Sequence, residues 1–166
     1  NLQPVTSQAT ATYAEIPLAY DQLPTLEQLK QDATSSNIYV AARAGALARQ
    51  IESGTPLSPT YPYPVQMWKL GQNVKWVILG GEVVVDYALR LKTELGDEVF
   101  ENQNVWVTAY SNDVMAYIPS RRVLGEGGYE GGGAMVYYGL PSVWAPNVED
   151  LILAEVTRQV RQQPTK

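Results

Sequence analysis

The sequence of 166 residues contains neither cysteine nor histidine. Without cysteine it has no disulfide framework and no thiolate nucleophile. Without histidine it has no Ser-His-Asp triad and no Cys/His zinc site of its own. Any chemistry must therefore come from carboxylates, Lys, Arg, hydroxyl groups or the backbone. The lack of cysteine leaves the compartment open, because such a chain is compatible with either redox environment.

Long apolar runs and an excess of basic residues are also missing. No segment approaches the ~18 apolar residues that a membrane span needs, so we expect no transmembrane segment. Because 12 Lys and Arg face 17 Asp and Glu, for a net charge of −5, we expect no nucleic-acid partner. The chain opens without a signal-peptide pattern and at Asn1 rather than Met, which is typical of a processed or excised piece.

What remains is the composition of a folded domain, with 45% apolar and 17% charged residues. The length suits one domain or part of a larger one. We expect a flexible lead-in over residues 1–11, a single α/β domain over 12–162, and a tail over 163–166.

The first half of the chain predicts a short edge strand over residues 12–18, ended by Pro17. A helix follows Pro24, because Thr25 and Gln28 have the spacing of a capping box. An Ala-rich helix is expected over 38–51, ending near Gly54. Two helices or one bent helix both fit this stretch. The Pro-rich residues 55–64 must be extended or looped.

The second half predicts a hairpin of strands 65–70 and 74–79, the latter buried on both faces. A helix over 84–95 and a strand over 105–110 complete a strand-helix-strand crossover. Residues 111–133 are expected to form a long Gly-rich loop, 136–138 a short strand, and a last amphipathic helix begins after Asn147. The predicted fold is therefore α/β, a mixed β-sheet with flanking helices, one crossover and this long loop.

Three features could carry chemistry, and each has a plainer interpretation. Glu82 follows two glycines at the end of a buried strand, where functional groups gather, but from the residues alone a carboxylate that caps its own helix is the favoured interpretation. The 111–133 loop is either functional or a mobile surface loop, and its glycines do not form a phosphate-binding loop. The pair Arg121 and Arg122 could clamp an anion, although a solvated pair is the favoured interpretation.

The order of these motifs resembles the neutral/alkaline (non-lysosomal) ceramidases. The similarity lies in Leu79-Gly80-Gly81-Glu82, Tyr110-Ser111-Asn112, Tyr117-Ile118-Pro119-Ser120 and Tyr129-Glu130-Gly131. The twelve-residue spacing from Tyr117 to Tyr129 is that of the family. The resemblance covers about residues 62–146. This sequence departs from the family pattern at Gly80, at residues 118–120 and at residues 132–133.

The resemblance implies the C-terminal part of a zinc amidohydrolase that cleaves ceramide-type N-acyl amides. Glu82 and Tyr117 would be zinc ligands, and Tyr129 would be the catalytic residue that stabilises the oxyanion. The remaining zinc ligands and the general base would be histidines, supplied by an upstream part of the same protein. A lipid amide would be the substrate, and the resemblance suggests an extracytoplasmic or secreted location. The alternative is a binding or structural domain that keeps this fold and does no chemistry.

Four expectations follow from the resemblance. Glu82 and Tyr117 should lie close together. The isolated chain should show neither hydrolysis nor tight zinc binding. The two ligands and Tyr129 should occupy an open face, with Tyr110 and Met115 more exposed than usual. Such a face could drive self-association.

Overall fold

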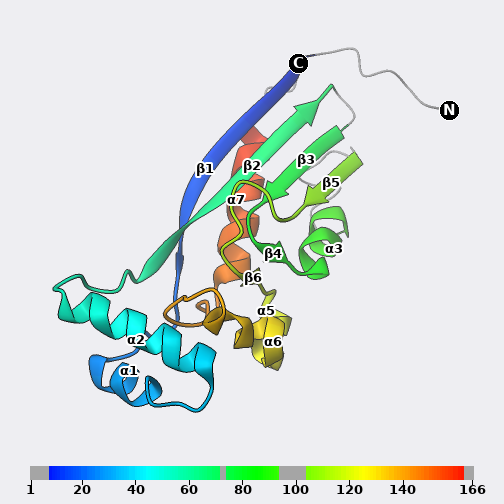
Figure 1. Ribbon diagram of the computed structural model, residues 1–166. Coiled ribbons are helices and arrows are strands. Elements are labelled where there is room, and N and C mark those ends of the chain that lie inside the picture. The colour runs from blue at the N-terminus through cyan, green and yellow to red at the C-terminus, as the bar shows by residue number, and fades with distance from the viewer. Residues whose placement is uncertain (1–7, 72–73, 94–103, 163–166) are drawn as a thin grey trace.

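A computed structural model describes residues 8–71, 74–93 and 104–162. Its main feature is a four-stranded sheet in the order β1-β2-β3-β5, formed by β1 (Ala9–Ala19), β2 (Thr60–Leu70), β3 (Val74–Leu79) and β5 (Asn104–Thr108). The β1–β2 and β2–β3 pairs are antiparallel, whereas β3 and β5 are parallel. The long C-terminal helix α7 (Val148–Gln162) lies behind the sheet (Figure 1). The predicted mixed α/β fold is confirmed.

The outer pair of strands, β1 and β2, is longer than the sequence suggested. Their ladder runs from the pair Ala9–Leu70 to the pair Ala19–Thr60. Residues 9–11, expected in the lead-in, therefore belong to the strand, while residues 1–7 and 163–166 lie outside the described residues. Pro17 does not end β1, because an edge strand tolerates a proline, and Pro62 stands opposite it.

Prolines also misled the expectation for β2, which begins at Thr60 rather than after residue 64. Strand β3 pairs only with Val65–Leu70 of β2. Pro62 and Pro64 lie in the preceding part of β2, which has only β1 as a ladder neighbour. A missing N–H is tolerated there, because one side of the strand has no ladder to complete.

The hairpin and the crossover are confirmed. Strand β3 has the predicted bounds, although Val74 and Trp76 are half-buried rather than covered. Helix α3 (Val85–Thr93) stands between β3 and the parallel strand β5, with Tyr87 and Leu91 buried. The expected end of this helix at residues 94–96 lies outside the described residues.

The main core lies between the sheet and α7. Strand residues Leu18, Tyr63 and Met67 pack there with Ile152 and Val156 of the helix. Gln159 is also fully buried in this layer. Its amide donates to the Val65 carbonyl at 3.0 Å, and its oxygen accepts from Thr12 Oγ1 at 2.7 Å. Gln159 thus connects α7 to both long strands with its polar atoms satisfied.

Helices α1 (Leu26–Asp32) and α2 (Ile38–Glu52) form a separate lobe beside the ends of β1 and β2 (Figure 1). The capping box of Thr25 and Gln28 is present in both directions, and Asn37 caps α2. There are two helices, not one bent helix. They share a small core of their own, formed by Leu29, Ala44, Leu47 and Ala48.

The long loop expected over residues 111–133 is instead a series of short elements. Strand β6 (Tyr117–Ile118) pairs in parallel with β4 (Glu82–Val83), and α5 (Arg121–Glu126) and α6 (Gly128–Gly131) follow. A 3₁₀ helix, η1 (Gly133–Val136), replaces the short strand predicted over 136–138. These elements are so short that they give no periodic apolar pattern, which is why the sequence indicated a loop.

Candidate functional site

Two glycines end β3 and let two chain segments approach each other closely. Gly81 has a φ of +64°, and a Cβ there would lie 2.6 Å from the Ala116 carbonyl oxygen. Its own backbone donates to the Asp113 carbonyl at 2.8 Å and accepts from the Tyr110 amide at 2.8 Å. Gly81 thus makes room for the 110–116 backbone, and Gly80 for the side chains of Pro64 and Met115.

This close approach places Glu82 directly beside Tyr117. The two residues are register partners in the parallel β4–β6 ladder. The phenols of Tyr117 and Tyr110 both lie beside the Glu82 carboxylate, and this contact raises the pKa of each phenol to about 12. Glu82 therefore belongs to a strand and a polar cluster, three residues before α3 begins, rather than to the first turn of that helix.

The backbone is strained on the side of the cluster that carries Tyr110. Tyr110 and Asn112 have φ values of +54° and +68°, a left-handed backbone conformation that residues other than glycine seldom adopt. Asp113 holds this turn, because its carboxylate accepts from Tyr61 Oη at 2.6 Å and from the Val114 amide at 2.7 Å. Strain of this kind gathers at functional sites, where the surrounding structure maintains it.

Tyr129 joins the cluster through its ring. The rings of Tyr117 and Tyr129 meet edge-to-face with centroids 5.3 Å apart, and Tyr137 lies 5.9 Å beyond Tyr129. The side chains of Tyr129 and Tyr110 are 54% and 53% exposed, so an open face was correctly expected for them. The expectation for Met115 is wrong. It is 6% exposed, because it packs beneath Gly80 and Gly81.

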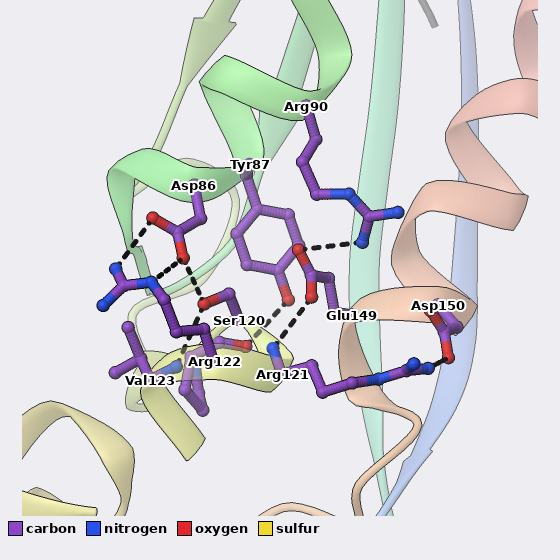
Figure 2. A network of polar contacts seen from close by, with 10 residues as sticks. Asp86, Tyr87, Arg90, Ser120, Arg121, Arg122, Val123, Glu149 and Asp150 are labelled. Atoms are coloured by element: carbon purple, nitrogen blue, oxygen red, sulfur yellow. Dashed lines mark hydrogen bonds and ion pairs between the residues drawn. The ribbon is translucent and has the colours of Figure 1, made fainter. Parts of the chain in front are cut away.

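Arg121 and Arg122 do not form an anion clamp. Arg122 makes a two-pronged contact with Asp86 at 3.0 and 3.1 Å (Figure 2). It also pairs with Glu126. Arg121 pairs with Asp150, although their side chains are exposed. Both guanidinium groups are therefore already neutralised by carboxylates. The favoured interpretation of an exposed, solvated pair describes Arg121 and Arg122 better than an anion clamp does. In addition, Arg122 joins α3 to α5 through its contact with Asp86.

The donor set at Glu82 suits a hard divalent cation in part. A carboxylate oxygen and a phenol oxygen stand side by side, and such oxygens are accepted zinc ligands. They do not complete a coordination shell. Across the described residues, no group of three or more His, Cys, Asp or Glu side chains is placed to hold a metal. A cation at Glu82 would need further ligands from elsewhere.

The fold can be compared with known proteins once this geometry is in place. Neither the family models nor the curated proteins contain a match to the chain. Among solved structures, the neutral ceramidase from Pseudomonas aeruginosa is similar, with a TM-score of 0.55 and 16% sequence identity. The alignment covers 94% of this chain and 28% of the ceramidase chain. The chain therefore has a ceramidase-like fold and spans a little over a quarter of that enzyme's length.

The sequence had brought Glu82, Tyr117 and Tyr129 together through the resemblance, and the structure places them together. Their roles as ligands and catalyst stay predictions. Sequence reasoning missed Tyr110 as a partner of Glu82. It also missed Asp86, four residues further along the chain, which binds Ser120 and Arg122. The available signal for Asp86 was an acidic residue at the start of the predicted helix.

Proposed function

We propose that this chain is the C-terminal part of a ceramidase-like zinc amidohydrolase acting on N-acyl amides of the ceramide type. In this proposal Glu82 and Tyr117 hold the zinc together with histidines from an upstream part of the same protein. The observation that carries the proposal is the direct register of Glu82 with Tyr117, which sets the Tyr117 phenol beside the Glu82 carboxylate, with the ring of Tyr129 against Tyr117. The ceramidase-like fold supports it.

The residues of this chain would have distinct tasks. When bound, zinc polarises the amide carbonyl and lowers the pKa of a water molecule. Glu82 would supply the anionic ligand and Tyr117 the phenol ligand. Tyr110, whose phenol lies beside the Glu82 carboxylate, would donate a hydrogen bond to it and so fix its orientation. A fixed carboxylate orientation matters because ligand geometry sets the strength of the site.

Tyr129 would act on the substrate rather than on the metal. Its half-exposed position beside Tyr117 lets its hydroxyl reach a group bound at the open face. A phenol donor aimed at the carbonyl oxygen stabilises the negative charge that develops there during acyl transfer. The resemblance assigns the general base to a histidine, which this chain does not contain, so that step is assigned to the upstream part.

The test uses the full-length protein that contains this chain, a fluorescent N-acyl sphingosine and metal analysis. Glu82→Gln and Tyr117→Phe should each lower bound zinc and reduce hydrolysis by about 100-fold or more. Tyr129→Phe should retain zinc and lower kcat by about 100- to 1,000-fold. Glu130→Gln is the matched control, because this neighbouring carboxylate is also exposed and should leave both unchanged.

The competing view is a domain that keeps the fold without catalysis. It predicts no zinc above background and no hydrolysis in the unmodified full-length protein. It also predicts indifference to Glu82→Gln. That pattern would end the proposal. No helix among the described residues is long and apolar enough to cross a membrane.

A further inference from the structure

The β4–β6 ladder, which aligns Glu82 with Tyr117, is too short to be stable by its own hydrogen bonds. Strands β4 and β6 contribute two residues each. Around them the Glu82 amide donates to the Ala116 carbonyl at 2.9 Å, and the Val84 amide to the Ile118 carbonyl at 3.3 Å. An isolated pair of strands is marginal even when it is much longer. Something outside the ladder must fix its register.

The first candidate for that role is Asp86, in the first turn of the helix that follows β4. Its carboxylate accepts from Ser120 Oγ at 2.5 Å and takes both prongs of Arg122 (Figure 2). Ser120 caps α5, the helix that follows β6, by accepting from the Val123 amide. Asp86 therefore ties the helix after one strand to the cap of the helix after the other.

Two further residues, Tyr87 and Glu149, support the same junction from the inside. The buried Tyr87 hydroxyl donates to the Pro119 carbonyl at 3.1 Å. Glu149 of α7, only 3% exposed, accepts from the Arg121 amide at 2.8 Å and pairs with Arg90 at 3.1 Å. The chain on both sides of the β4–β6 ladder is thus anchored to α7 and the core (Figure 2).

The charges of this network fit a structural tie rather than a binding site. A groove of about 520 Å³ lies beside it, lined by the carboxylates of Asp86 and Glu149 as well as by three arginines. Among the described residues, Arg90 pairs with Glu149, Arg121 with Asp150, and Arg122 with Asp86 and Glu126. No unpaired cation of the network is left to recognise an anion.

We propose that Asp86, acting through Ser120 and Arg122, is a positioning residue that holds Glu82 in register with Tyr117. The consequence for hydrolysis rests on the proposed function, whereas the consequence for the ladder does not. Asp86 touches neither substrate nor zinc in this account. It fixes where the Glu82 carboxylate stands, and geometry at the reacting centre is sensitive to displacements of about 1 Å.

The experiment is hydrogen–deuterium exchange with mass spectrometry on the full-length protein, combined with steady-state kinetics. Asp86→Ala removes both contacts, and the milder Asp86→Asn keeps an oxygen for Ser120 while losing the charge. In the peptide over residues 80–86, Asp86→Ala should speed exchange by about tenfold and Asp86→Asn by about two- to fivefold, and both should speed it more there than in the β2–β3 peptides. The control is Glu126→Gln, which removes the exposed second carboxylate that pairs with Arg122. It should leave exchange unchanged both in the 80–86 peptide and in the β2–β3 peptides.

Kinetics separate positioning from general stability. Asp86→Asn should lower kcat by about tenfold or more while KM stays within about twofold. Uniformly faster exchange in all peptides would show a merely structural role and overturn the proposal. So would unchanged exchange over 80–86 in both Asp86 variants.

The two proposals can fail separately. If the unmodified protein binds no zinc and hydrolyses no amide, yet Asp86→Asn still loosens residues 80–86, the proposed function fails and the positioning role stands. If the unmodified protein is active and Asp86→Asn changes neither exchange nor kcat, the positioning role fails and the enzyme stands.

Discussion

The two ladders of this molecule are built in opposite ways. The β1–β2 ladder has eleven register pairs, from Ala9–Leu70 to Ala19–Thr60, and one of its faces packs on α7. The β4–β6 ladder has two, and polar side chains of the following helices support it. The long ladder holds the fold, while the short one carries the candidate site.

The difference shows how stability and precision are distributed. A long ladder with a buried face is over-determined, because each apolar pair enforces the same register. In a two-residue ladder, the few backbone hydrogen bonds contribute too little free energy to favour the correct register over a shifted one. Side chains with fixed geometry, such as the Asp86–Arg122 pair, supply that choice. Changes in the first region should therefore affect the whole fold, and changes in the second should affect Glu82 and Tyr117.

The largest effect is expected from the long ladder. Met67→Ala removes a fully buried side chain of β2 and should lower the free energy of unfolding by about 2–5 kcal/mol. Denaturant unfolding followed by circular dichroism measures this. Exchange should rise in the sheet and α7 together. A loosening confined to β4 and β6 would contradict the division between the two ladders.

The next effect tests the glycine that brings the short ladder together. Gly81→Ala places a Cβ 2.6 Å from the Ala116 carbonyl at a φ of +64° and should cost about 2–3 kcal/mol. Gly54→Ala is the matched control, since its φ is +86° but no atom lies within 4 Å of the added Cβ. It should cost about 1–2 kcal/mol. Equal losses for the two variants would show that the close approach does not matter.

A smaller and more local effect is expected in the α1–α2 lobe. Thr25→Ala removes the hydroxyl that accepts from the Gln28 amide and should cost about 1 kcal/mol. Because the lobe has its own small core, exchange should rise in α1 and α2 and not at β4. Transmission of this change to the 80–86 peptide would mean that the lobe and the site are coupled.

The smallest effect depends on pH. The Arg122 and Ser120 hydrogen bonds lower the pKa of the Asp86 carboxyl. A carboxyl with a lowered pKa in the folded state stabilises above its unfolded pKa, near about 4, and loses that contribution as the pH falls through the folded value. Asp86→Asn should therefore cost about 0.5–1 kcal/mol at pH 7, since Arg122 is exposed, and progressively less below about pH 4. A difference that persists unchanged at pH 2 would exclude the ion pair as its source.

The sequence predicted the regions in which local signals agree with the tertiary structure. Residues 74–79 and 148–162 have long apolar patterns, and Thr25 with Gln28 forms the capping box that the spacing indicated. Pro17 and Pro62 misled the strand bounds, because their tolerance depends on which strand edge is unpaired. Which edge of a strand is unpaired is determined by the order of strands in the sheet, and the local sequence does not show it.

The candidate site was only partly accessible to such reasoning. Glu82, Tyr117 and Tyr129 came from a resemblance in motif order. Tyr110 lies beside Glu82 because Tyr110 and Asn112 adopt a left-handed backbone conformation, which no sequence pattern predicted. Likewise, the glycines of residues 111–133 predicted a loop, whereas Gly131 packs its Cα against the Val123 carbonyl and compacts α5 and α6. Short elements held by such contacts carry no periodic signal.

The most direct test of the central claim is a crystal structure of the full-length protein with anomalous scattering recorded at the zinc edge. Our account predicts one anomalous peak at about 2.0–2.2 Å from a Glu82 carboxylate oxygen and from Tyr117 Oη. Upstream histidines should complete the shell. A zinc peak elsewhere, or none after growth with zinc, while Glu82 and Tyr117 still stand in register in the ladder, would contradict it.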